Sequence, residues 1–358
     1  MGPPETIHRT RGHTVRIRHA IRRSLRAAAR LAGAYRPRGA LVLLYHSIAD
    51  VASDPWALHV TPRHFDEHLE VLGRQYTLIP LRALPHASAS LSGRAVAITF
   101  DDGYANNLEA AEQLKRRGMP ATVFVSVGAA GQPLEFWWDE LDRLLLEPGR
   151  LPPVLELTVN NKRSVWSLGS GMYDHGEMSR HREWRGWEEV HGPRQALYVA
   201  LWNLLHDMSH DAREEIMTTV HTWGNRAREA RPTHRTFSLE ELGDLGRDGA
   251  IQLGAHGVTH TSLAGLPHSA QRDEILGSKR MLEKLVHRPV TTFAYPFGRD
   301  YNAATVDLVR ESGYTHACSG VAARVEPTVD PFQIPRLQVP DCDGARFAKL
   351  LKEWFSTA

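Results

Sequence analysis

The chain has 358 residues, of which 42% are hydrophobic and 23% are charged, and its formal net charge is +2. This length suits one large α/β domain or two smaller ones, and the composition is typical of a globular protein. No apolar run approaches the roughly 18 residues of a membrane-spanning helix. The two cysteines, Cys318 and Cys342, exclude a disulfide framework and a CxxC zinc site.

Residues 1–38 form a strongly basic arm. They hold ten Arg and one Glu, a formal charge of +9, so the other 320 residues sum to −7. Apolar residues recur in the arm at spacings of three and four, namely Ile17, Ile21, Leu25, Ala28, Leu31 and Tyr35. This pattern predicts a basic amphipathic helix that rests on an anionic membrane surface. A flexible basic tail is the main alternative. Nucleic-acid binding is less favoured, because the rest of the chain is acidic and carries no recognition motif.

The arm does not match a secretory signal. Arg26 and Arg30 interrupt the apolar stretch that such a signal needs, and no adequate apolar region follows the Arg22–Arg23 pair. An organellar transit peptide stays an alternative, since it too is rich in Arg and poor in acidic residues. We therefore expect a cytoplasmic protein with peripheral membrane contact through residues 1–38 and with no nucleic-acid partner.

Beyond the arm, strand-like apolar runs alternate with helical patterns. The expected elements are, in chain order, a strand over 40–46, a helix opened by Thr61–Pro62, a strand over 94–100, a helix over 104–117, a strand over 121–126, a helix from Ser238, a strand over 250–256, a helix over 269–286, a strand over 290–296, a further helix, strands over 314–319 and 332–339, and a C-terminal helix. Such alternation predicts a parallel sheet, and about seven strands favour a sheet closed into a barrel.

Residues 135–237 break this alternation and hold seven of the nine Trp, namely Trp137, Trp138, Trp166, Trp184, Trp187, Trp202 and Trp223. Residues 154–168 predict a β-hairpin that turns at Asn160–Asn161, and residues 193–208 predict an amphipathic helix. We interpret the segment as an inserted subdomain with a small core of its own, in which one or two Trp face a ligand. The expected domains are the arm, a barrel of residues 39–134 and 238–358, and the inserted subdomain.

Chemically reactive side chains follow several of the expected strands. "TFDDGY" places Asp101 and Asp102 at one strand end, although adjacent carboxylates repel each other. A strand-ending turn with a helix cap is the structural alternative. His46 and His256 end two further strands. Because the carboxyl ends of parallel strands meet on one face, we expect these residues to share a pocket.

"GAHGVTH" places His256 and His260 four residues apart. Such a pair can be incidental in a chain with 20 His. With a carboxylate, however, it forms a two-His, one-carboxylate site that leaves coordination positions open for water and substrate. One Asp of the pair at 101–102 can then bind a divalent metal while its neighbour acts as a base for water bound to the metal.

The three motifs "TFDDGY", "GAHGVTH" and "FAYPFG" resemble, in this order, the signatures of polysaccharide deacetylases, carbohydrate esterase family 4. The resemblance covers about residues 39–134 and 238–340. It implies a distorted (β/α)7 barrel and a metal-dependent hydrolase that removes acetyl groups from N-acetylated sugars of a polysaccharide or glycan precursor. It also implies that Asp101 is the catalytic base and that the Phe297 N–H binds the oxyanion. The implied metal ligands are Asp102, His256 and His260, with zinc favoured over cobalt, nickel or iron.

The chain departs from this family where many members carry an Arg that holds the catalytic Asp, because it has Ala294–Tyr295 there. Arg336, at the end of "DPFQIPR", is expected to supply the charge, as in deacetylases of biofilm poly-N-acetylglucosamine. A surface ion pair is the alternative. Those relatives take the general acid from an N-terminal strand that "LYHSI" resembles, so His46 is the predicted acid and His316 the alternative.

The sugar contacts are predicted from position alone. Tyr295 ends an expected strand, and Trp137 and Trp138 follow the strand over 121–126 closely. All three are therefore expected to bind substrate, since aromatic faces stack on sugar rings. Three alternative functions stay open: an Fe(II) oxygenase with the same ligand set, an inactive glycan-binding module, and an amide hydrolase acting on a non-sugar substrate.

Overall fold

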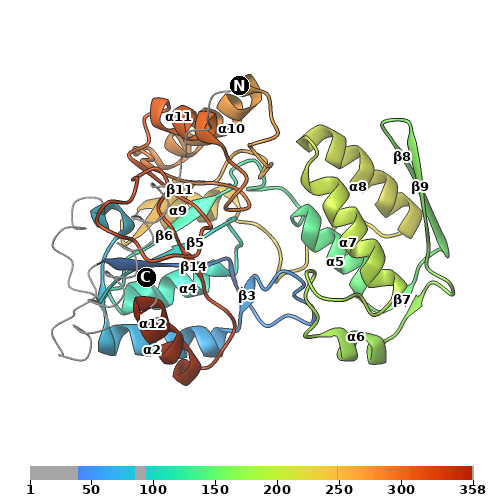
Figure 1. Ribbon diagram of the computed structural model, residues 1–358, viewed down its shortest axis with the longest axis horizontal. Helices are drawn as coiled ribbons and strands as arrows, with labels where there is room; N and C mark the ends of the chain where they lie inside the picture. Colours follow the sequence, from blue (N-terminus) through green and yellow to red (C-terminus); the bar gives the residue numbers. More distant parts are fainter. Residues whose placement is uncertain (1–38, 85–93, 248, 357–358) are drawn as a thin grey trace, which may run out of the picture.

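The structure is a computed structural model that describes residues 39–84, 94–247 and 249–356 (Figure 1). The amphipathic helix predicted for residues 1–38, and its membrane contact, lie outside these residues. Within the described part of the chain, no helix combines the length and the apolar character needed to cross a bilayer.

Seven parallel strands form the curved sheet of a barrel, in the spatial order β13-β12-β11-β6-β5-β1-β14. Their bounds are β1 (Ala40–Tyr45), β5 (Ala95–Phe100), β6 (Ala121–Val125), β11 (Ile251–Ala255), β12 (Thr292–Ala294), β13 (His316–Cys318) and β14 (Leu337–Gln338). A short strand, β4 (Thr77–Leu78), pairs with the start of β5, and β2 (Ser47–Ile48) pairs with β3 (His59–Val60). The arrangement confirms the predicted α/β barrel.

Side chains alternate between the two buried faces of the sheet. In β1, Leu41 and Leu43 pack toward the helices, whereas Ala40 and Val42 belong to the cluster inside the barrel. Phe124 fills part of that interior and lies against Gly254, where an added Cβ would come within 2.4 Å of the ring. Burial on both faces explains why these strands are continuous apolar runs in the sequence.

One segment touches both edges of the sheet and closes the barrel. Ile334 pairs with Cys318 of β13, and Leu337 then pairs with Leu43 of β1. The strand expected over 332–339 is therefore regular only at Leu337–Gln338. Pro335 lacks the N–H that would continue a ladder, so the chain crosses between the two edges there.

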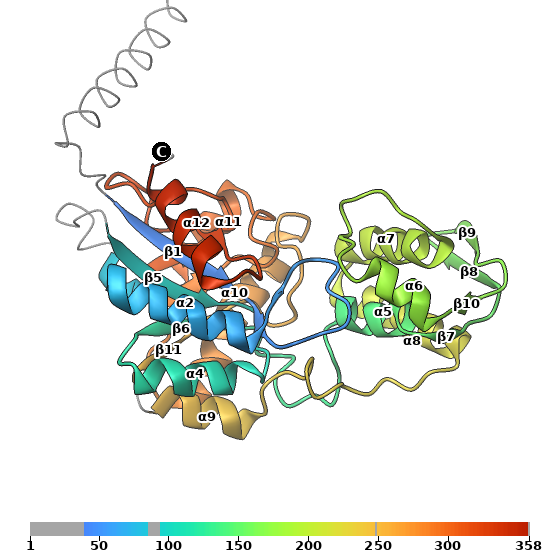
Figure 2. The same ribbon diagram turned by 90° about the horizontal axis from the view of Figure 1, so that it is seen from below.

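The helices of the barrel follow the strands in sequence and cover them (Figures 1 and 2). They are α2 (Pro62–Gln75), α4 (Asn107–Arg116), α9 (Leu239–Arg247), α10 (His268–Val286), α11 (Ala303–Glu311) and α12 (Gly344–Ser356), together with the 3-10 helix η1 (Leu81–Ala83). The expected helix starts at Pro62 and after Ser238 are observed. The helix expected over 104–117 begins later, because Tyr104 pairs with Thr236 in an isolated bridge.

A second group of elements gathers in a lobe beside the barrel (Figures 1 and 2). It comprises α5 (Trp137–Leu146), α6 (His175–His181), α7 (Pro193–His206), α8 (His210–Gly224), the hairpin of β8 (Val154–Val159) and β9 (Lys162–Ser167), and the pair β7 (Gly149–Arg150) and β10 (Met172–Tyr173). Asn160 and Asn161 form the hairpin turn with φ of 49° and 61°, which Asn tolerates better than most residues. The lobe has a hydrophobic cluster separate from that of the barrel core.

Candidate active site

A cavity of about 520 Å³ lies where the strand ends of the barrel meet the lobe. The barrel contributes the residues that follow β1, β5, β11 and β12, and the lobe contributes side chains of α5 and α7. The lining residues used below are His46, Trp56, Asp101, Asp102, Trp138, Trp202, His206, His256, His260, Phe297, Asp300 and Arg336. The predicted convergence of the strand ends is thus observed.

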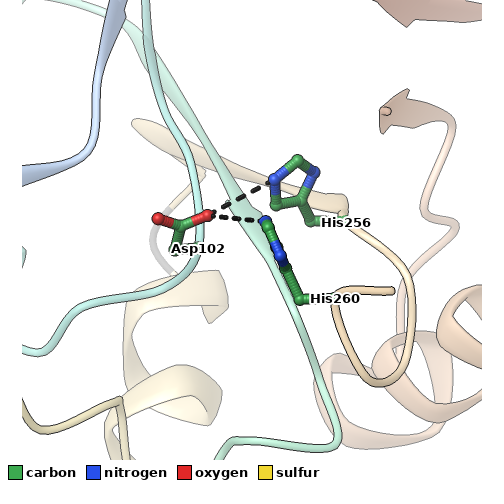
Figure 3. Close-up of side chains that lie close together, drawn as sticks. All are labelled: Asp102, His256 and His260. Atoms are coloured by element: carbon green, nitrogen blue, oxygen red, sulfur yellow. Dashed lines mark ion pairs between the residues drawn. The ribbon is translucent and has the colours of Figure 1, made fainter. Parts of the chain in front are cut away.

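Asp102, His256 and His260 point toward one another from the ends of β5 and β11 (Figure 3). Asp102 Oδ1 lies 3.4 Å from His256 Nε2 and 3.2 Å from His260 Nε2. Asp102 and His260 have φ of 71° and 51°, a left-handed conformation that costs energy for both residues and that surrounding contacts must hold. The three candidate ligand atoms all lie within 4.8 Å of one another.

The chemistry of this donor set fits a divalent metal. His256 Nδ1 lies 2.8 Å from the Ala294 carbonyl oxygen, so this hydrogen bond leaves Nε2 for a ligand. Burial alone would raise the pKa of Asp102, but hydrogen bonds from His256 and His260 hold it well below its ordinary value. Burial lowers the pKa of His260, which favours the neutral imidazole that binds metals.

Neighbouring elements support the loop that carries His260. Glu274 of α10 accepts hydrogen bonds from the backbone N–H groups of Val258 at 2.7 Å and Thr259 at 2.9 Å. From the lobe, Arg213 of α8 donates to the Thr259 carbonyl oxygen at 3.1 Å. The lobe therefore contacts the loop of a candidate metal ligand directly.

Arg336 and Asp101 form a bidentate ion pair with both N–O distances at 2.6 Å. Their side chains are 0% and 4% exposed, so the alternative of a surface ion pair is wrong. Arg336 Nε also donates to the Ser319 carbonyl oxygen, which fixes the guanidinium plane. Burial alone would raise the pKa of Asp101. The positive charge of Arg336 acts in the opposite direction, and the pKa lies below its ordinary value, so the carboxyl group stays ionised.

His46 follows β1 and lines the cavity. Its backbone oxygen accepts a hydrogen bond from Asn107 Nδ2 at 2.7 Å, which holds the chain at this strand end. Burial lowers the pKa of His46, although Asp102 and Asp101 act in the opposite direction. The alternative acid, His316, is buried and is the first residue of β13. It therefore lies at the end of that strand that is far from the cavity.

Phe297 lines the cavity, but Tyr295 does not, so the prediction that Tyr295 contacts substrate is wrong. Tyr295 N–H extends the sheet by donating to the Cys318 carbonyl oxygen at 3.1 Å. Alternation along the strand then places its ring beside Phe293 and away from the barrel interior. The ring is fully buried and stacks on Tyr301 at 3.9 Å.

Of the two Trp predicted to face the substrate, only Trp138 lines the cavity, with its ring centroid 4.8 Å from that of His260. Trp137 belongs, like Trp138, to the hydrophobic cluster of the lobe, but it does not line the cavity. Adjacent side chains on a helix point in different directions, so only one of these two neighbours faces the cavity. Sequence reasoning missed Trp56, Trp202 and His206; only Trp202 had a signal, namely the high Trp content of residues 135–237.

The family model for "Polysaccharide deacetylase" matches residues 88–202 and 212–317. Among curated proteins, YxkH of Bacillus subtilis (strain 168), which carries a polysaccharide deacetylase name, is 25% identical over 114 residues. This alignment covers 32% of the present chain and 40% of YxkH, less than half the length of that relative.

Solved deacetylase structures share the fold. IcaB from Ammonifex degensii has a TM-score of 0.54 at 15% identity, covering 88% of this chain and 98% of that one. The Streptococcus pyogenes deacetylase PplD in complex with acetate has a TM-score of 0.53 at 15% identity, covering 88% and 99%. BC0361, a polysaccharide deacetylase from Bacillus cereus, has a TM-score of 0.53 at 17% identity, covering 87% and 69%. The family model spans more than half of the sequence, and the chain belongs to the polysaccharide deacetylase family.

Proposed function

We propose that the protein is a metal-dependent hydrolase that removes acetyl groups from N-acetylated sugars of a polysaccharide or glycan precursor. The observation that carries this proposal is the juxtaposition of two carboxylates with different neighbours in one cavity. Asp101 is paired with Arg336, and Asp102 faces His256 and His260. Adjacent carboxylates in a cavity are costly unless each has such a partner.

Asp102, His256 and His260 would hold the metal. When bound, it supplies Lewis-acid polarisation of the acetyl oxygen and makes a water molecule more acidic. Two imidazoles and one carboxylate suit zinc, and cobalt, nickel or iron are alternatives.

The remaining residues act on protons and charge. Asp101 is ionised at neutral pH and accepts the proton of the attacking water, while Arg336 keeps both carboxylate oxygens in a fixed plane. The Phe297 N–H donates to the developing oxyanion. His46 delivers the proton that the departing amine requires, because an amine anion is too poor a leaving group.

Acetate release from a panel of N-acetylated and O-acetylated glycans tests the proposal. We expect release from N-acetylated glycans, loss after chelation, and recovery when zinc is added back. Release that survives complete removal of metal would contradict the metal dependence. Binding of glycan without any release would instead favour an inactive binding module, and release from non-sugar amides alone would favour the amide hydrolase.

A further inference from the structure

Trp187 lies on the surface of the lobe and is 64% exposed. An indole that open to water is uncommon, because Trp is highly buried on average. It lies in the turn over 185–188, and Trp184, which directly precedes this turn, is buried in the lobe core. The turn thus places one Trp inside the lobe and presents the other outward.

Several contacts fix the position of this turn. Gly186 N–H donates to the Pro55 carbonyl oxygen at 2.8 Å, which joins the turn to the segment leading into β3. A Cβ added at Gly186 would lie 2.8 Å from the Trp56 ring, so only glycine permits this close approach. Arg185 N–H donates to the Glu188 carboxylate at 2.9 Å and closes the turn. These contacts fix the backbone of the turn, so that Trp187 lies beside Trp56.

Trp56 connects Trp187 to the cavity. The ring centroids of Trp187 and Trp56 are 6.3 Å apart, and those of Trp56 and Trp202 are 4.3 Å apart. Trp56 Nε1 donates to the hydroxyl of the buried Tyr198 at 2.9 Å, which fixes the indole plane. Trp56 and Trp202 line the same cavity as His260. The three indoles form a continuous aromatic strip from solvent to the candidate active site.

We propose that this strip, Trp187, Trp56 and Trp202, binds the further sugar units of a glycan chain whose acetylated unit lies beside Asp101. The inference rests on the proposed function and narrows its substrate to oligomers and polymers. Indole faces are large, rigid and apolar, and they complement the C–H face of a pyranose ring. The strip is continuous with the cavity that Asp101 lines.

The charges around Trp187 favour a glycan over a lipid surface. Glu188 and Glu189 follow it directly and are exposed. These carboxylates repel an anionic membrane, whereas they attract the cationic amines that deacetylation leaves on the chain. Residues 182–189 also include Arg182 and Arg185, but with three Glu their formal charge is −1, whereas an interfacial lipid anchor is normally basic.

Kinetics with N-acetylglucosamine disaccharide and hexasaccharide test the strip, using Trp187→Ala. We expect kcat/KM for the hexasaccharide to fall about tenfold relative to that for the disaccharide, mainly through KM. Trp187→Phe should recover most of the ratio, because it restores an aromatic face. Val165→Ala, at a 53% exposed position on the β8–β9 hairpin, serves as the control for loss of an exposed apolar side chain and should leave the ratio unchanged.

Glycan binding, measured separately from acetate release, tests the strip independently of the proposed reaction. Calorimetric titration with the hexasaccharide should show weaker binding by Trp187→Ala than by the wild type, whether or not acetate is released. Such binding without acetate release would overturn the proposed function and leave the strip supported. Acetate release with an unchanged hexasaccharide-to-disaccharide ratio in Trp187→Ala would overturn the strip. Trp187-dependent sedimentation with phosphatidylglycerol vesicles, or Trp187-dependent dimerisation with no effect on glycan binding, would also overturn it.

Discussion

Asp101 and Asp102 are adjacent in sequence and yet face different partners. Both oxygens of Asp101 accept from Arg336, and Asp102 Oδ1 lies between the two imidazoles. The turn that separates them depends on the left-handed φ of 71° at Asp102, which rotates the second carboxylate away from the first. The backbone at one residue thereby gives the two carboxylates different partners.

This separation predicts opposite effects for two conservative variants. Asp101→Asn should keep its metal and lose turnover by about 10²- to 10⁴-fold, because it removes a base. Asp102→Asn should lose metal, because it removes an anionic ligand. Elemental analysis of the purified variants, together with acetate release, provides the measurement. Metal lost in Asp101→Asn and kept in Asp102→Asn would show that the two roles are reversed.

The Asp101→Asn variant also lowers stability, because it leaves a buried charge unpaired. A double variant separates this effect from the loss of the base. Asp101→Asn leaves Arg336 buried without its carboxylate, a loss of roughly 3–5 kcal/mol when one partner of a buried pair is removed. Asp101→Asn with Arg336→Met should recover part of the stability in thermal unfolding but none of the turnover. Recovery of turnover would argue against Asp101 as the base.

Convergence of strand ends in a parallel barrel was sufficient to predict that the Asp pair at 101–102 lies near His256 and His260, and the resemblance to polysaccharide deacetylases singled out Asp102. They were not sufficient for Tyr295 or Trp137. Which face a side chain takes depends on one step of register in a strand or on about 100° around a helix. Trp137 lies between Phe136 and Trp138, and Tyr295 lies between Ala294 and Pro296, so their immediate neighbours do not reveal the orientation.

At the scale of elements, the end of α7 is joined to the loop after β12 by an ion pair. His206 Nε2 lies 2.9 Å from Asp300 Oδ2, and His206 Nδ1 lies 2.7 Å from Asp207 Oδ1. Burial lowers the pKa of His206, but the hydrogen bonds to Asp300 and Asp207 outweigh it and raise the pKa above its ordinary value. The contact links the lobe to the barrel across the cavity.

This contact predicts a pH-dependent stability. Since the pKa of His206 is raised on folding, its contribution is complete below the unfolded pKa of about 6.5 and is lost as pH rises through the folded value. His206→Gln should therefore lower Tm by about 1–3 °C at pH 6 and have less effect at pH 9. Thermal unfolding of both proteins across this range provides the measurement. A Tm difference that grows with pH would contradict the assignment.

Elements with strong local signals were predicted well. The Pro62 start of α2 and the Asn160–Asn161 turn follow from residues that favour one backbone conformation. The strand expected over 332–339 was predicted less well, because its regular part is set by pairing with β1, nearly 300 residues earlier in the chain. A local pattern does not contain that partner.

At the scale of the whole molecule, the barrel, the lobe and the basic arm differ in how far the sequence alone could describe them. Alternation of strands and helices predicted the barrel. The Trp content predicted a separate core in the lobe, but not that α7 would line the cavity, which depends on contacts between distant segments. The arm lies outside the described residues, and its role stays a prediction.

We propose that residues 1–38 bind anionic lipid surfaces and bring the enzyme to a membrane. Their formal charge of +9 should make binding weaken as salt rises, because exposed charges are screened. Sedimentation with phosphatidylglycerol vesicles should retain the full chain and leave a protein starting at Gly39 in the supernatant. Equal sedimentation of both proteins would contradict the proposal.

The crossing segment that closes the barrel also sets the order in which the site can assemble. Arg336 binds Asp101, which lies 235 positions earlier in the sequence, so forming this contact costs loop-closure entropy. Until β14 docks on β1, Asp101 lacks the Arg336 guanidinium, the charge that lowers its pKa most, and burial would favour its protonated form. The strand pair that closes the barrel therefore also brings Arg336 to Asp101, and we expect a chain in which β14 is undocked to lack the ionised form of this carboxyl group.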